Sequence, residues 1–191
     1  MFLVSRQQDV AHVAQLLEDQ GWGVLPLSYS DCGAPEAVEA FRTLIVVAHG
    51  DDAGVVYMCS DGRTSVKWMW PEIDADLSDS RLYLYCCSAG VELIPRFVDK
   101  ELFGHIGKVP MPQSGVSNDL VTQFLGVVWD TMANDEFDRR VWREKFITFL
   151  DSVQMQLDRY PPTEVVGIED YFCAHLLRES LQFTEDMFSC L

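Results

Sequence analysis

Basic side chains are scarce in this sequence. Its 191 residues include 14 lysines and arginines against 30 aspartates and glutamates, which gives a formal net charge of −16. Such an excess of negative charge argues against a surface that binds nucleic acid and against adhesion to an anionic membrane. A basic partner is allowed, but the simpler interpretation is that the acidic side chains solvate the surface.

Long apolar runs and targeting signals are also lacking. No apolar run approaches the ~18 residues of a membrane-spanning helix. Residues 1–6 do not begin with the basic segment and long apolar stretch of a secretory signal. We therefore expect a cytoplasmic protein that does not bind a membrane.

The cysteines are too few for a disulfide scaffold and lack the paired CxxC spacing of a zinc site. No metal and no other cofactor is expected, and a reducing cytoplasm suits these thiols. For most of them the simplest role is that of a small buried apolar residue. The six are Cys32, Cys59, Cys86, Cys87, Cys173 and Cys190.

The sequence shows no internal repeat and no low-complexity tract, and its length suits a single domain over residues 1–191. The first half alternates short apolar runs with helical periodicity. This order predicts a largely parallel sheet of an α/β protein. Strands are expected at 2–5, 24–27, 43–48 and 81–85, and helices at 7–20 and 36–42.

Between the strands at 43–48 and 81–85, residues 54–58 and 64–68 flank the turn signal Ser60-Asp61-Gly62 and predict a β-hairpin. Such a hairpin can border a ligand-binding crevice or can be a plain insertion, and the sequence favours neither.

The rest of the chain is expected to be mainly helical. A helix should follow Gly90 and run towards Phe103, and a short strand is expected at 108–112. Residues 1–112 would then form the sheet core and 113–191 a helical part, with helices from Ser117, over 138–159 and, more weakly, over 164–183. Aromatic residues in these helices favour packing, so we assign them no chemistry.

Two of the predicted strands end in residues that can do chemistry. The run Thr43–Ala48 stops at His49-Gly50, and the run Arg81–Tyr85 stops at Cys86-Cys87-Ser88-Ala89-Gly90. In open α/β sheets, ligands bind in the crevice beyond the carboxyl ends of the strands. A His and a Cys delivered there are plausible partners in nucleophilic catalysis. His12, His105 and His175 do not directly follow a predicted strand and are expected to be structural.

This pair of motifs resembles the caspase-like cysteine peptidases of clan CD, and within them the CHAT-type and separase-like members more than animal caspases. The resemblance rests on Ile45 to Gly50 and on Leu82 to Gly90, about a quarter of the chain. It implies a three-layer α/β sandwich with a mainly parallel central sheet and additional C-terminal helices.

The resemblance also implies roles for single residues. His49 would be the base, Cys87 the nucleophile, and Gly50 would contribute a backbone N–H to the oxyanion hole. Arg6, in the loop after the first strand, falls roughly where caspases place an arginine of the substrate pocket. No third catalytic residue is required.

Cys87 is chosen over its neighbours because alignment of Gly90 with the glycine that ends the family motif places Cys87 on the nucleophile. Adjacent residues of an extended chain also point to opposite faces, so Cys86 and Cys87 cannot both face His49. We expect Cys86 to be an inert apolar residue under a covering helix. Ser88 should lie in the first turn of the following helix.

The expected activity is therefore that of a cysteine endopeptidase acting on a protein or peptide substrate. By resemblance to caspase-like proteins of microbes, it would act as a regulated module of a signalling or defence system, with an activator as partner. The segment before the nucleophile departs from that of animal caspases, which have Gln-Ala where Tyr85-Cys86 stand here. Metacaspases carry an Asp at the position of Tyr85, so an acidic pocket of their kind is not supported.

Two other functions stay open. Cys86 to Gly90 can be read as an altered nucleophile elbow of an α/β-hydrolase, with Ser88 as the nucleophile of a serine esterase. Such an enzyme needs a later acid and histidine, and Asp170 and His175, five residues apart in a predicted helix, are a poor pair. The other alternative is an inactive caspase-like binding module, against which the intact His49 and Cys87 argue.

Overall fold

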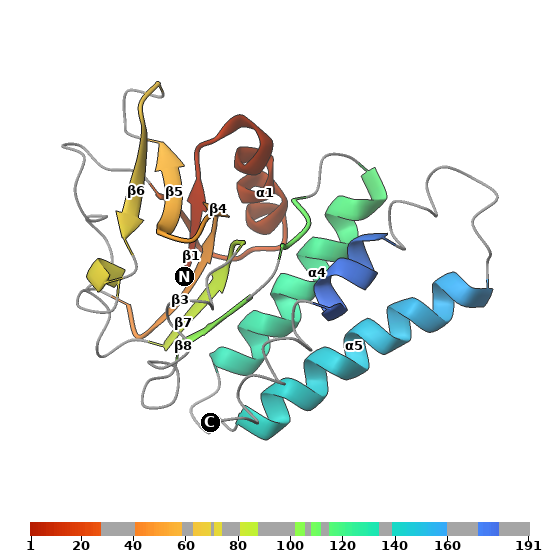
Figure 1. Ribbon diagram of the computed structural model, residues 1–191. Helices are drawn as coiled ribbons and strands as arrows, with labels where there is room; N and C mark the ends of the chain where they lie inside the picture. The colour runs from red at the N-terminus through yellow and green to blue at the C-terminus, as the bar shows by residue number, and fades with distance from the viewer. Residues whose placement is uncertain are drawn as a thin grey trace.

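In the computed structural model the chain forms a mixed α/β fold, with a parallel sheet flanked by helices (Figure 1). The structure describes residues 1–27, 41–58, 63–69, 71–73, 81–87, 102–105, 108–111, 115–133, 139–159 and 172–179. None of the helices in these ranges is long and apolar enough to cross a membrane.

Among the described residues, the main sheet has five strands in the order β2-β1-β3-β7-β8, and each neighbouring pair is parallel. The strands are β1 (Phe2–Ser5), β2 (Val24–Leu27), β3 (Thr43–Val47), β7 (Arg81–Tyr85) and β8 (Leu102–Gly104). The predicted mainly parallel α/β sheet is therefore confirmed. Pro26 lies in the edge strand β2, where its missing N–H does not interrupt a ladder.

A second, antiparallel sheet contains the predicted hairpin. It consists of β4 (His49–Gly50), β5 (Gly54–Met58) and β6 (Ser65–Met69). The hairpin prediction is confirmed, but the pairing of His49-Gly50 with β5 was not foreseen. Because of this pairing, the hairpin is joined directly to the His-Gly motif. The predicted turn at residues 60–62 lies outside the described residues.

The helices α1 (Gln8–Asp19), α4 (Gly115–Met132) and α5 (Arg139–Arg159) lie on one side of the main sheet (Figure 1). The helix α1 buries Val10, Val13 and Leu17, the apolar positions that recur at helical spacing. It is followed by Gly21, whose φ of 80° is the left-handed conformation that glycine adopts most readily. A further helical segment, 172–179, falls within the predicted third C-terminal helix.

The two faces of the parallel sheet bury separate apolar clusters, because side chains alternate along each strand. On the helix face, Val47 and Tyr85 pack with residues of α1, α4 and α5. On the opposite face, Ala48 and Cys86 pack with Val55, Tyr57 and Trp68 of the hairpin. The strand ends are thus covered by helices on one side and by the hairpin on the other.

Two expectations in the middle of the chain are wrong. Leu102–Gly104 form strand β8, where a continuing helix was expected, and the described residues 108–111 are not a strand. The parallel pairing of β8 with Leu82–Leu84 explains the difference, because a tertiary contact outweighs local periodicity. His105 consequently does follow a strand directly, contrary to the expectation. The predicted helices at 36–42 and after Gly90 lie outside the described residues, apart from 41, 42 and 102–104.

Candidate active site

The two motif-bearing strands, β3 and β7, are neighbours in the parallel sheet. Their register pairs Val47 with Tyr85, the last residue of each strand. The contact continues beyond the strands, since the Ala48 N–H donates a hydrogen bond to the Tyr85 carbonyl at 3.3 Å. His49 and Cys87, two residues beyond the last pair, therefore lie at the same edge of the sheet.

The glycine after His49 fits directly against the cysteine motif. A Cβ added to Gly50 would collide with the carbonyl oxygen of Cys87 and would lie 3.2 Å from the Cβ and the Sγ of Cys86. Only a residue without a side chain allows this close approach. The two motifs, about forty residues apart in sequence, are thus in direct backbone contact.

Cys86 and Cys87 point to opposite faces of the sheet. Cys86 is fully buried in the cluster that includes the hairpin residues. Cys87 is partly buried against the other cluster, which joins the sheet to α1, α4 and α5 and is called the helix-face cluster below. Burial, with a smaller contribution from the charge of Cys87, raises the pKa of the Cys86 thiol far above its usual value. Cys86 therefore stays protonated, as expected for an unreactive thiol. The cluster that covers it includes strand residues of the hairpin, not the helix alone that was expected.

The sulfur of Cys87 contacts the segment after β8. The backbone N–H of Val109 donates to Sγ at 3.4 Å, and Sγ lies 3.9 Å from the Val109 carbonyl. The next carbonyl, that of Pro110, accepts a hydrogen bond of 2.6 Å from the Tyr85 hydroxyl. Tyr85 thereby fixes the segment that contacts the sulfur, with the Val109 N–H as a donor to Sγ and the Val109 carbonyl as an acceptor.

His49 extends from β4 to helix α1. Its Nε2 lies 2.6 Å from Oδ2 of Asp9 in the first turn of that helix. Both side chains are partly exposed, 36% for His49 and 47% for Asp9. The contact places the imidazole on the helix side of the sheet, which is also the side of Cys87.

The loop that follows His49-Gly50 is fixed by Asp51. Its carboxylate accepts hydrogen bonds from the N–H groups of Ala53 and Gly54, and it pairs with Lys67 of β6. The hydrogen bond from Lys67 is the main reason why the pKa of Asp51 is lowered from its usual value. Asp51 therefore stabilises the turn between β4 and β5.

The other residues named from the sequence lie as follows. Arg6 is exposed just after β1, which is a neighbour of β3, so it lies at the same edge of the sheet as His49. Ser88, Ala89, Gly90 and Asp170 lie outside the described residues. His175 lies 3.1 Å from Glu179 of its own helical segment.

His105 is completely buried beneath the strand ends. Its Nε2 lies 2.6 Å from the Tyr83 hydroxyl, and burial lowers its pKa to about 3. The imidazole is therefore neutral at neutral pH and accepts or donates hydrogen bonds in the core. This environment agrees with a structural role and not with that of an exposed base.

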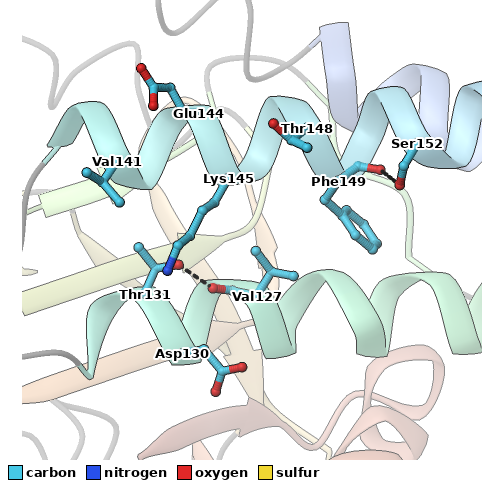
Figure 2. Close-up of a pocket in the computed structure, with 9 residues that line it drawn as sticks. All are labelled: Val127, Asp130, Thr131, Val141, Glu144, Lys145, Thr148, Phe149 and Ser152. Carbon is cyan, nitrogen blue, oxygen red and sulfur yellow. Dashed lines mark hydrogen bonds between the residues drawn. The ribbon is translucent and has the colours of Figure 1, made fainter.

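A hollow of about 620 Å³ lies elsewhere, between α4 and α5 (Figure 2). Two hydroxyl groups of its lining bond carbonyl groups of their own helices: Thr131 donates to Val127 and Ser152 to Phe149, each at 2.7 Å. None of the residues predicted for catalysis lines this hollow. Within the described ranges, no three histidine, cysteine or acidic side chains gather as a metal site would require.

Comparisons with protein-family models, with curated proteins and with solved structures found no match. The site is therefore assigned from its own geometry. Sequence reasoning missed Asp9, Tyr85 and Val109. The position of Asp9 at this edge, but not its contact with His49, could have been found, because Asp9 follows β1 and the carboxyl ends of neighbouring parallel strands meet at one edge.

Proposed function

We propose that this chain is a cysteine endopeptidase of the caspase-like type, with His49 as the base and Cys87 as the nucleophile. One observation carries the proposal: the two residues follow neighbouring parallel strands in register, and the backbone of Gly50 packs directly on that of Cys87. A strand-end His and Cys held together in this way fit a dyad in which the imidazole takes the proton of the thiol.

The reaction would proceed through a thioester. The imidazole of His49 takes the Sγ proton of Cys87, and the thiolate attacks the carbonyl carbon of the scissile peptide bond. The C–N bond breaks as His49 returns the proton to the leaving amine. Water, deprotonated by His49, then attacks the thioester and releases the new carboxylate and the thiol.

Backbone N–H groups would stabilise the oxyanion that forms in both steps. The candidates are the N–H groups of Gly50 and Cys87, which belong to the two segments in contact. The N–H of Val109 would instead stabilise the thiolate before attack, since it already donates to Sγ. Different groups would thus serve the nucleophile and the substrate oxygen.

A protein or peptide is the proposed substrate. Arg6 is exposed at the same edge of the sheet and would contact an acidic group of the substrate. In this proposal the chain acts in the cytoplasm as a regulated module of a microbial signalling or defence system, together with an activator. No cofactor takes part.

A peptide library assayed with the purified chain tests the activity and its specificity together. We expect Cys87→Ala to abolish hydrolysis, and His49→Ala to reduce it by about 10²-fold or more. Cys86→Ala is the matched control, because it removes the adjacent thiol, and it should mainly lower stability.

Two outcomes would change the proposal. Loss of hydrolysis in Ser88→Ala, with Cys87→Ala still active, would favour the serine esterase. Strong turnover by the purified chain alone would remove the need for an activator. A chain that neither cleaves a peptide nor reacts with a thiol-directed peptide probe would be the inactive binding module.

A further inference from the structure

The closest polar partner that the structure gives His49 is a carboxylate on a different element. Asp9 lies forty residues earlier, yet its Oδ2 is 2.6 Å from Nε2 of His49. An ionised carboxylate can only accept hydrogen bonds, so Nε2 must carry the proton in this contact. The other ring nitrogen, Nδ1, is then left with a lone pair whenever the imidazole is neutral.

The geometry of the ring decides which nitrogen is available to the thiol. Nε2 is at the tip and is directed to α1, whereas Nδ1 adjoins Cγ and stays close to the main chain. That main chain lies beside the cysteine motif, as the fit of Gly50 against Cys87 shows. Because Nε2 is engaged by Asp9, Nδ1 is the ring nitrogen left to accept a proton from the thiol.

Helix α1 also supports the charge of Asp9. Asp9 is the acidic residue in the first turn of this helix, where the partial positive charge of the helix N-terminus favours a carboxylate. The helix itself is anchored through Val10, Val13 and Leu17, all fully buried in the helix-face cluster. Asp9 is consequently held on a rigid element and not on a loop.

We infer that Asp9 is a positioning residue of the site: it keeps His49 in the tautomer with the proton on Nε2, presents Nδ1 to Cys87, and stabilises the imidazolium that forms when Nδ1 takes the thiol proton. The inference rests on the proposed function. It replaces the expected dyad by a Cys-His-Asp arrangement in which Asp9 does not touch the substrate.

The competing explanation is an ordinary surface ion pair. Asp9 and His49 are both partly exposed, and exposed pairs contribute little to stability. A pair of that kind would leave the rate of the chemical step unchanged when Asp9 is replaced. The rate therefore separates the two explanations, and the tautomer of His49 shows whether the contact exists in solution.

The kinetic test compares Asp9→Asn with Asp19→Asn on the best peptide of the library. Both variants lose one negative charge from α1, but Asp19 lies at the other end of the helix, where it bonds Gln15. We expect Asp9→Asn to lower kcat about 10- to 100-fold with KM unchanged within twofold, because orientation of the base is lost and substrate contacts are kept. Asp19→Asn should match the wild type.

A spectroscopic test uses no substrate. The ¹⁵N NMR spectrum of histidine-labelled protein should show His49 protonated at Nε2 and unprotonated at Nδ1 when the ring is neutral. Asp9→Ala should remove the hydrogen-bonded Nε2 proton signal, and Asp19→Ala should keep it. A wild-type His49 protonated at Nδ1 would overturn the inference.

The two proposals fail in different ways. A wild-type chain that neither cleaves a peptide nor reacts with a thiol-directed peptide probe would contradict the proposed function, and the role of Asp9 with it. An active wild type whose kcat is unchanged by Asp9→Asn would contradict the role of Asp9 alone.

Discussion

At the scale of single residues, Gly50 matters for the side chain that it lacks. The close approach of its Cα to the Cys87 carbonyl and to Cys86 joins the two motifs at the sheet edge. The same residue belongs to β4 and pairs with Val55 of the hairpin. A side chain at this position would disturb the cysteine motif on one side or the hairpin pairing on the other.

We therefore expect Gly50→Ala to destabilise the chain by about 1–3 kcal/mol, the usual cost of forcing a group into a filled site, and to lower peptidase activity severely. Gly21→Ala is the matched control. An added Cβ there meets nothing within 4 Å, but the φ of 80° is strained for alanine and should cost about 1 kcal/mol. Thermal unfolding and peptide hydrolysis measure the two effects. Equal activity of both variants would contradict a special role for Gly50.

At the scale of elements, two tyrosines of β7 reach different partners on the same face. Tyr85 bonds the Pro110 carbonyl, whose segment contacts the Cys87 sulfur, and Tyr83 bonds His105. Both tyrosine rings also pack against Phe124 of α4. The strand thus anchors the segment after β8 by one hydroxyl and a buried histidine by the other.

Removal of either hydroxyl should lower the stability by a similar amount. The two variants should differ in the reactivity of the Cys87 thiol. We expect Tyr85→Phe and Tyr83→Phe each to cost about 1 kcal/mol of stability or somewhat more, since each removes one hydrogen bond, from the partly buried Pro110 carbonyl or from the buried His105. Only Tyr85→Phe should slow the alkylation of Cys87, because it loosens the Val109 N–H. Alkylation rates measured by mass spectrometry would refute this account if the two variants were slowed equally.

Much of this arrangement could be predicted from the sequence, and the failures have physical causes. The strands β1, β2, β3 and β7 are continuous apolar runs, so local pattern is enough to find them. Strand β8 has only three residues and is defined by its pairing with β7, which no local pattern reports. The short strand β4 escaped prediction for the same reason, because His49-Gly50 is a strand only through its pairing with β5.

The candidate site shows the same division. His49 could be named because it ends an apolar run, and Gly50 and Cys87 because the resemblance to caspase-like peptidases implies roles for them. The contact of Asp9 with His49 joins a helix to a strand end across forty residues, and it depends on side-chain reach that spacing does not show. The contact of Val109 with Cys87 escaped prediction because residues 108–112 were expected to be a strand.

At the scale of the whole molecule, the buried His105 makes stability depend on pH. Its pKa is lowered by burial to about 3, against about 6.5 in an unfolded chain. The unfolded state therefore binds more protons between these values, and stability falls as the pH drops below about 6.5. Above that pH the group makes no difference, because the imidazole is neutral in both states.

We expect this histidine to cost about 2 kcal/mol of stability on going from pH 7.5 to pH 5, which is about 1.5 pH units below the unfolded pKa. His105→Gln keeps a hydrogen-bonding group for Tyr83 and should show a smaller loss over the same range. Urea unfolding of both proteins at the two pH values measures the difference. Equal losses would mean that His105 is protonated in the folded chain.

The central claim is that Cys87, and not its neighbour, is the nucleophile activated by His49. Its most direct test is peptide mapping by mass spectrometry after reaction at pH 7 with a peptidyl electrophile that forms a thioether. The account predicts a stoichiometric adduct on Cys87, none on the buried Cys86, and a rate at least about 10²-fold lower in His49→Ala. An adduct on Ser88 or on another cysteine, or a Cys87 that reacts equally fast without His49, would contradict it.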